Sequence, residues 1–181
     1  NDLLHLNSHP SVFHHYATKP AAATAPAELL GALRGVARLA AHADAGAAVH
    51  SNKVVVLLAL VRAAQQRGEQ TLVFSNSNQT LRVLADALRT ELDVRAEVLI
   101  GKVGDGDRQG MLARFQRGEQ PVLLISRRVA GEGLTLTAAS RVVLFEPCWN
   151  PMAERQAIGR AYRLGQRRPV CVYRLQCGKF E

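Results

Sequence analysis

Residues 122–135 read VLLISRRVAGEGLT, an unbroken apolar run followed by a hydroxyl, two arginines and a loop with two glycines. A short, continuous apolar run bounded by polar residues is typical of a strand that is buried on both faces of a parallel sheet. The polar residues after it would then stand at the carboxyl end of that strand, where open parallel sheets bind their ligands. This one segment therefore predicts both a class of fold and a place for a site.

The same strand-forming unit recurs on both sides of this segment. Amphipathic stretches predict helices over about residues 51–68, 79–91, 107–117 and 151–164, and apolar runs predict strands over 71–75, 96–100, 122–126, 141–145 and 170–175. Such strict alternation predicts an α/β fold, a parallel sheet with helices on both faces. We expect the strand ends at Ser75-Asn76, Ile100-Gly101, Ser126-Arg127-Arg128 and Glu146-Pro147 to meet at one edge.

Residues 1–50 differ in character from the rest of the chain. The stretch from Ala21 to Ala48 is dominated by alanine, and its larger apolar residues recur at helical spacing. We expect residues 1–50 to form a variable, partly helical connection and residues 51–181 to form the folded domain. The chain begins with Asn1 rather than Met and has no basic-then-apolar signal pattern, which indicates a fragment of a longer protein.

The composition excludes a membrane protein and a wholly disordered chain. A length of 181 residues, with 48% hydrophobic and 21% charged residues, suits one globular domain, and no apolar run approaches the roughly 18 residues of a membrane helix. Three cysteines without a C-x-x-C pair support neither a disulfide framework nor a zinc ribbon, so a reducing compartment is expected. The formal charge is +8, and the last 41 residues hold eight basic and three acidic side chains. An arginine excess can bind phosphate, although a solvated basic surface explains it equally well.

Two segments carry residues suited to phosphate chemistry. In the first, Gly131 and Gly133 permit close approach of a phosphate to backbone N–H groups, and Arg127 and Arg128 can add charge-assisted bonds. A bulged turn, in which the glycines only relieve strain, is the alternative.

The second segment runs from Trp149 to Gln166. Asn150 and Pro151 suit the start of a helix, on which Gln156, Arg160 and Arg163 stand at i, i+4 and i+7 and would share one face. Another face, which the helix would bury, is expected to hold the apolar residues Met152, Ala157, Ile158, Ala161 and Leu164. Paired arginines could neutralise the oxygens of a transferring phosphoryl group, or they could simply form an exposed basic face.

Other features of a complete nucleotide hydrolase or metal site are absent. Gly101-Lys102 lacks the upstream glycine and the following Ser or Thr of a phosphate-binding loop, and no strand ends in an acidic pair suited to Mg²⁺. We therefore expect no unaided nucleotide hydrolysis and no metal site. The residues His5, His9, His14 and His15 have no acidic or thiolate partner at a recognisable spacing, and Cys148 is expected to be a packed hydrophobe.

Taken together, four segments resemble the helicase C-terminal lobe of the Swi/Snf-type ATPases, the DNA translocases of chromatin remodelling and recombination. LVFS at 72–75 looks like motif IV, SRRVAGEGLTLTAA at 126–139 like motif V, QAIGRAYRLGQ at 156–166 like motif VI, and WNP at 149–151 like the element before it. The resemblance runs from about Ser51 to Arg174. Tyr162 and RPVCVYRL at 168–175 are most similar to the ATRX-like branch.

The resemblance implies a RecA-like lobe and assigns roles to residues. It implies that ATP with Mg²⁺ is bound mainly by an N-terminal lobe in cis, and that Arg160 and Arg163 are arginine fingers which Gln156 helps to orient. Gly131 and Gly133 would shape motif V at the cleft between the lobes. The implied DNA-contacting residues are Ser75, Asn76, Ser126, Arg127 and Arg128, and Trp149 would link the nucleotide state to the DNA-facing surface.

The expected function is thus that of a second lobe in an ATP-dependent double-stranded DNA translocase of the chromatin-remodelling or DNA-repair type. It would be nuclear and would act on double-stranded DNA, with nucleosomes as a further candidate substrate, and it would be inactive as a fragment. The alternative is a catalytically degenerate lobe that binds DNA or docks proteins, because Ala130, Glu132 and Thr135 depart from the usual motif V. A strand-separating helicase of the same superfamily is a third reading.

Overall fold

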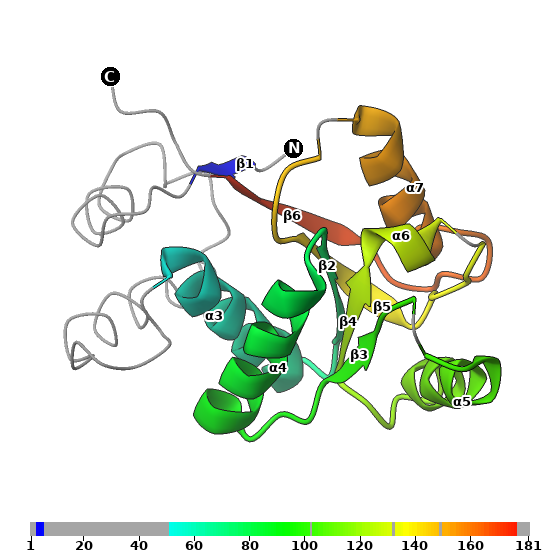
Figure 1. Cartoon of the computed structure of the whole chain (residues 1–181), viewed down its shortest axis with the longest axis horizontal. Helices are drawn as coiled ribbons and strands as arrows, with labels where there is room; N and C mark the ends of the chain where they lie inside the picture. The colour runs from blue at the N-terminus through cyan, green and yellow to red at the C-terminus, as the bar shows by residue number, and fades with distance from the viewer. Residues whose placement is uncertain (1–2, 6–50, 102, 132, 149, 177–181) are drawn as a thin grey trace.

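The structure is a computed structural model that describes residues 3–5, 51–101, 103–131, 133–148 and 150–176. In this part of the chain six strands form one sheet in the order β1-β6-β5-β2-β4-β3, and every pairing is parallel (Figure 1). The strands are β1 (Leu3–His5), β2 (Gln70–Ser75), β3 (Glu97–Leu99), β4 (Val122–Ser126), β5 (Ala139–Leu144) and β6 (Cys171–Gln176). The helices are α3 (Asn52–Gln66), α4 (Asn78–Leu92), α5 (Asp105–Gln116), α6 (Arg127–Ala130) and α7 (Pro151–Ala161).

The helices cover both faces of the sheet. Because successive strand residues point to opposite faces, each strand contributes side chains to the contacts on both. Val73 and Leu124 belong to the apolar cluster formed with α3 and α4. Leu72, Phe74 and Ile125 belong to a second cluster that includes residues of α5, α6 and α7. Figure 1 shows α3 and α4 on one side of the strands and α5 and α7 on the other. The doubly covered parallel sheet predicted from the sequence is therefore confirmed.

Strand β2 lies in the middle of the sheet and aligns the edge that carries the predicted site. Ser75, its last residue, is in register with Ser126 at the end of β4, and Phe74 is in register with Leu144 at the end of β5. The segments that follow these three strands therefore emerge side by side.

The sequence did not predict two of these elements. Leu3–His5 forms β1 and pairs with β6, so one strand of the sheet lies within the segment expected to be a connection. The loop expected after β4 begins with the four-residue helix α6. The helix expected between residues 21 and 48 lies outside the described residues. In the described part of the chain, none of the helices has the length and apolar character required to span a bilayer.

Helix α7 is shorter than predicted, ending at Ala161 rather than Leu164. Its last carbonyl groups are taken by groups outside the helix: the Leu136 N–H donates to the Arg160 carbonyl at 2.8 Å, and the Gln166 side-chain amide donates to the Ala161 carbonyl at 3.2 Å. One long-range bond and one local side-chain bond thus replace the next helical turn. The prediction that Met152 and Leu164 are buried by this helix is wrong, because they are 54% and 99% exposed.

Candidate functional site

The two predicted finger arginines converge on one loop. The Arg160 Nη2 atom lies 3.4 Å from the Gly131 carbonyl oxygen. The Arg163 Nη1 atom donates to the Thr135 hydroxyl at 3.0 Å and lies 3.5 Å from the Gly133 carbonyl oxygen. The loop that follows α6 and the end of α7, which are about 30 residues apart in the sequence, thus meet at the strand-end edge of the sheet.

The predicted common face of Gln156, Arg160 and Arg163 is only partly correct. Gln156 and Arg160 lie one turn apart on α7, but Arg163 follows the end of the helix, in the turn that Gln166 closes. Gln156 and Arg163 are exposed, and Arg160 is half-buried. The arginines therefore reach the loop from two different backbone supports, one helical and one in a turn.

The loop itself needs glycine at one position. Gly133 has φ of +82°, in the left-handed region that disfavours side chains, and a Cβ there would have no heavy atom within 4 Å. Backbone conformation, rather than crowding, therefore requires this glycine. At Gly131 a Cβ would lie 3.4 Å from the Arg128 carbonyl oxygen, an ordinary contact.

A carboxylate that carried no role in the sequence-based prediction organises the end of β2. Glu146, directly after β5 and Phe145, accepts a hydrogen bond from the Ser75 hydroxyl at 2.9 Å and another from the Asn76 N–H at 3.0 Å. Ser75 is 0% exposed. Glu146 is the first acidic residue after a predicted strand, and this position is the sequence signal that could have identified it.

Arg127, the first residue of α6, lies at the same place. Its Nη2 atom donates to the backbone carbonyl of Glu146. Its Nε and Nη1 atoms are buried and have no hydrogen-bond partner among the residues that the structure describes. Buried guanidinium donors are normally paired, so this arrangement has unused hydrogen-bonding capacity.

A second carboxylate, Glu154, fixes α7 to the sheet. It is buried, accepts the Cys148 N–H at 2.9 Å, and forms an ion pair with Arg174 of β6 at 2.8 Å. Burial on its own would raise the pKa of Glu154, but the Cys148 N–H and the charges of Arg174 and Arg127 outweigh it, and the pKa is lowered. Glu154 is therefore held ionised between the helix and the strand.

The sequence matches a known protein family, and the match covers the candidate site. Residues 52–165 match the family described as "Helicase conserved C-terminal domain". The chain belongs to this family. The match runs from the start of α3 to the turn after α7, and so includes every site residue from Ser75 to Arg163.

Relatives of this helicase C-terminal domain narrow the group. The chain is 40% identical over 134 residues to the mouse (Mus musculus) "DNA excision repair protein ERCC-6-like", covering 72% of this chain and 11% of the relative. It is 34% identical over 139 residues to the Saccharomyces cerevisiae "DNA repair and recombination protein RAD26", covering 75% of this chain and 13% of that protein. It thus spans only a small part of these curated relatives.

A solved structure agrees with this grouping. The "C-terminal part of Fun30 ATPase domain" superposes with a TM-score of 0.68 at 25% identity, covering 96% of this chain and 62% of the other. The chain is thus a helicase C-terminal domain of the Swi/Snf family, with the RecA-like fold expected.

Within this helicase domain, the residues expected to contact DNA separate into two groups. Asn76 and Arg128 are exposed at the strand-end edge, whereas Ser75 and Ser126 are buried and Arg127 is half-buried. Trp149 lies outside the described residues. Because Ser75 and Ser126 are buried, DNA cannot contact their hydroxyls in this conformation. The assignment of all six residues to DNA contact or coupling stays a prediction.

Other basic residues of the domain have structural partners. Arg141 forms a two-point ion pair with Glu69 at 2.7 and 3.0 Å and donates to the Tyr173 hydroxyl at 2.7 Å. Arg168 donates to the Gly68 carbonyl at 2.8 Å. Both Glu69 and Gly68 precede β2, so these contacts lie at the strand-start edge, opposite the candidate site.

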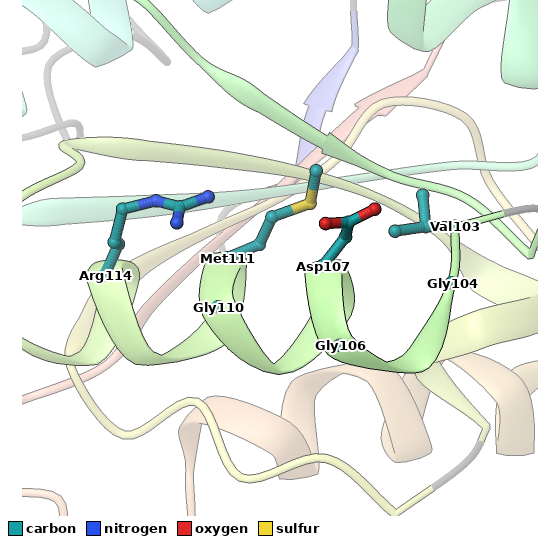
Figure 2. Close-up of a pocket in the computed structure, with 7 residues that line it drawn as sticks. All are labelled: Val103, Gly104, Gly106, Asp107, Gly110, Met111 and Arg114. Atoms are coloured by element: carbon teal, nitrogen blue, oxygen red, sulfur yellow. The ribbon is translucent and has the colours of Figure 1, made fainter.

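A pocket of about 380 Å³ runs along α5 of the domain (Figure 2). Gly106 and Gly110, one helical turn apart, lie beside the side chains of Asp107, Met111 and Arg114. None of the predicted site residues lines it. No group of three or more His, Cys, Asp or Glu residues that could hold a metal occurs in the described ranges.

Proposed function

We propose that this domain is the second RecA-like lobe of an ATP-dependent double-stranded DNA translocase of the chromatin-remodelling or DNA-repair type. In the intact protein it would supply Arg160 and Arg163 to ATP with Mg²⁺ held by an N-terminal lobe in cis. The observation that carries the proposal is the convergence of both guanidinium groups on the loop from Gly131 to Thr135.

The contacts of the two arginines are of a kind that the guanidinium groups can exchange for contacts with phosphate. Three of the contacts between these arginines and the loop are to neutral oxygens, and two of the three distances are long, at 3.4 and 3.5 Å. A bond from a guanidinium to a charged phosphate oxygen is shorter and stronger than a bond to a neutral carbonyl. The γ-phosphate of ATP would therefore compete effectively with the loop for both side chains, and the loop would register whether ATP is present.

The DNA partner is proposed on similar grounds. Asn76 and Arg128 are exposed on the strand-end edge and can donate to backbone phosphates. The relatives named above are DNA repair proteins, which supports double-stranded DNA as the partner and a nuclear location. Nucleosomes would be a substrate if the intact protein remodels chromatin.

The experiment is a DNA-stimulated ATPase assay of the intact protein with Arg160→Ala and with Arg163→Ala. Removing an arginine finger costs about 10³-fold in turnover, and we expect a loss of that order from either change. Arg155→Ala is the matched control, because Arg155 is an exposed arginine of α7 outside the assigned set. Turnover equal to that of the unsubstituted protein in both finger variants would contradict the proposal.

The degenerate-lobe alternative rests on motif V. Thr135 stands where the family usually has Asn, yet its hydroxyl holds Arg163, so this departure keeps a link between the two motifs. DNA binding by an intact protein that shows no DNA-stimulated ATP hydrolysis would favour the docking module. A strand-displacement assay beside triplex displacement would distinguish a strand-separating helicase from a translocase.

The narrower grouping with the ATRX-like branch rests on Tyr162 and residues 168–175 alone. The relatives reported above belong to the ERCC-6-like and RAD26 group, so the branch stays a prediction. A phylogeny of the intact sequence would decide between them.

A further inference from the structure

The end of β2 carries two donors at the strand-end edge, the Ser75 hydroxyl, which is buried in this conformation, and the Asn76 N–H, and a DNA phosphate would contact them only after their present acceptor has moved. Both are already bonded to the Glu146 carboxylate, at 2.9 and 3.0 Å. A phosphate also needs these donors and repels a carboxylate beside it. Glu146 and a phosphate therefore cannot occupy this position at the same time.

Arg127 contacts the backbone of the same residue, Glu146, and is the candidate second partner for its carboxylate. The Arg127 guanidinium already donates through Nη2 to the backbone carbonyl of Glu146 itself. Its Nε and Nη1 atoms are buried without a partner within the described residues. Leaving charged donors buried and unpaired is costly, and a carboxylate is the group that best satisfies a guanidinium in a two-point contact.

We propose that Glu146 is a positioning residue with two alternative partners, Ser75-Asn76 in the DNA-free state and Arg127 when a DNA phosphate takes its place. The inference rests on the proposed function, in that DNA must approach this edge. Arg127 then receives the displaced carboxylate rather than touching DNA, which differs from the role that the family resemblance implied for it. In one movement, the exchange takes the negative charge of Glu146 away from the place where the phosphate binds and pairs the Nε and Nη1 donors of Arg127.

The first test is the affinity of the intact protein with Glu146→Gln for a blunt double-stranded DNA, measured at one fixed salt concentration. Because the competing bonds to a charged acceptor become weaker, we expect binding to tighten about three- to tenfold. Unchanged or weaker binding would overturn the proposal, since it would mean that Glu146 does not compete with phosphate. If the unsubstituted protein fails to bind DNA, the proposed function fails instead.

Loss of a negative charge could tighten binding without any exchange of partners, and a double-mutant cycle separates the two causes. In a Ser75→Ala background one of the contested donors is gone. Exchange therefore predicts that the gain from Glu146→Gln falls by about half or more. A gain of undiminished size would show simple charge repulsion and would overturn the proposal.

The role of Arg127 is tested by Arg127→Met in both backgrounds, after thermal melting has shown that the variants fold. We expect weaker DNA binding when Glu146 is present, because the displaced carboxylate then has no partner, and little change together with Glu146→Gln. Equal losses in both backgrounds would mean that Arg127 itself contacts DNA, which would contradict the proposal. If Arg127→Met does not fold, Arg127→Lys serves instead, with a smaller loss in the same pattern.

Discussion

At the scale of single residues, the helix that carries Arg160 depends on one buried carboxylate, Glu154, that its neighbours hold ionised. Glu154 joins the Cys148 N–H, α7 and Arg174 of β6 through two hydrogen-bonded oxygens. Removing one member of a buried ion pair leaves the other uncompensated. The helix that carries Arg160 is therefore tied to the sheet by an interaction that a single substitution can remove.

We predict that Glu154→Gln lowers the free energy of unfolding by about 1–3 kcal/mol at pH 7, since it removes charge-assisted bonds. The measurement is urea unfolding. The exposed pair Arg117–Glu119 supplies the control, because Glu119→Gln should change stability little. A stability for Glu154→Gln equal to that of the unsubstituted protein would show that the ion pair contributes nothing.

The same residue predicts a pH dependence. The pKa of Glu154 is below its usual value near 4.5, so its contribution is present above that pH and is lost as pH falls through the lower folded-state pKa. The stability difference between the unsubstituted protein and Glu154→Gln should thus be constant from pH 7 to about pH 5 and shrink in more acidic buffer. A difference that grew on acidification would have the wrong sign for this account.

At the scale of elements, α7 is defined by its caps. The Asn150 side chain accepts the Met152 N–H at 2.9 Å, and Pro151 occupies the first turn, as the sequence predicted. The other end could not be predicted, because Leu136, whose N–H bonds to the Arg160 carbonyl, is brought to it only by the tertiary fold. Helical spacing therefore predicted correctly that Arg160 lies on α7, but it also predicted a helical position for Arg163, which lies beyond the end of the helix.

We predict that Asn150→Ala destabilises the domain by about 1 kcal/mol, the usual value for a lost cap. Asn150→Asp keeps an acceptor at the cap and should retain the stability of the unsubstituted protein. Midpoints of urea unfolding for the two variants provide the comparison. Equal losses in both would show that the capping bond is not what matters at this position.

The acidic members of the site show what local patterns cannot supply. Arg160, Arg163 and the glycines follow spacings that can be recognised in one segment. Glu146 contacts Ser75 across 71 residues and Arg127 across 19, so its role appears only when three strand ends are side by side. The two elements missed, β1 and α6, are too short to produce a periodic signal.

At the scale of the whole molecule, the sheet separates two apolar clusters and holds the site at one edge. Phe74 of β2 is 0% exposed and belongs to the cluster that also contains Ala157 and Ala161 of α7. The order of elements in this core could be predicted because continuous apolar strands and amphipathic helices alternate along the chain. Their lateral order in the sheet could not, because it depends on crossovers that no local pattern encodes.

We predict that Phe74→Ala lowers the free energy of unfolding by about 3–5 kcal/mol, through lost burial and the cavity left behind. Val83→Ala, at an exposed position of α4, should change it by about 0.5 kcal/mol or less. Urea unfolding with an unchanged denaturant slope would confirm that the effect is on the native core. A loss for Phe74→Ala as small as that for Val83→Ala would contradict the central position assigned to β2.

The account depends most directly on the arginines acting on ATP that another lobe binds. The decisive measurement is the single-turnover rate of ATP hydrolysis by the intact protein with Arg160→Ala, with enough protein in excess over ATP to bind all of it and with saturating double-stranded DNA. The account predicts a rate constant about 10³-fold below that of the unsubstituted protein, since the chemical step loses its charge stabilisation even when ATP is bound. An unchanged rate constant would contradict it.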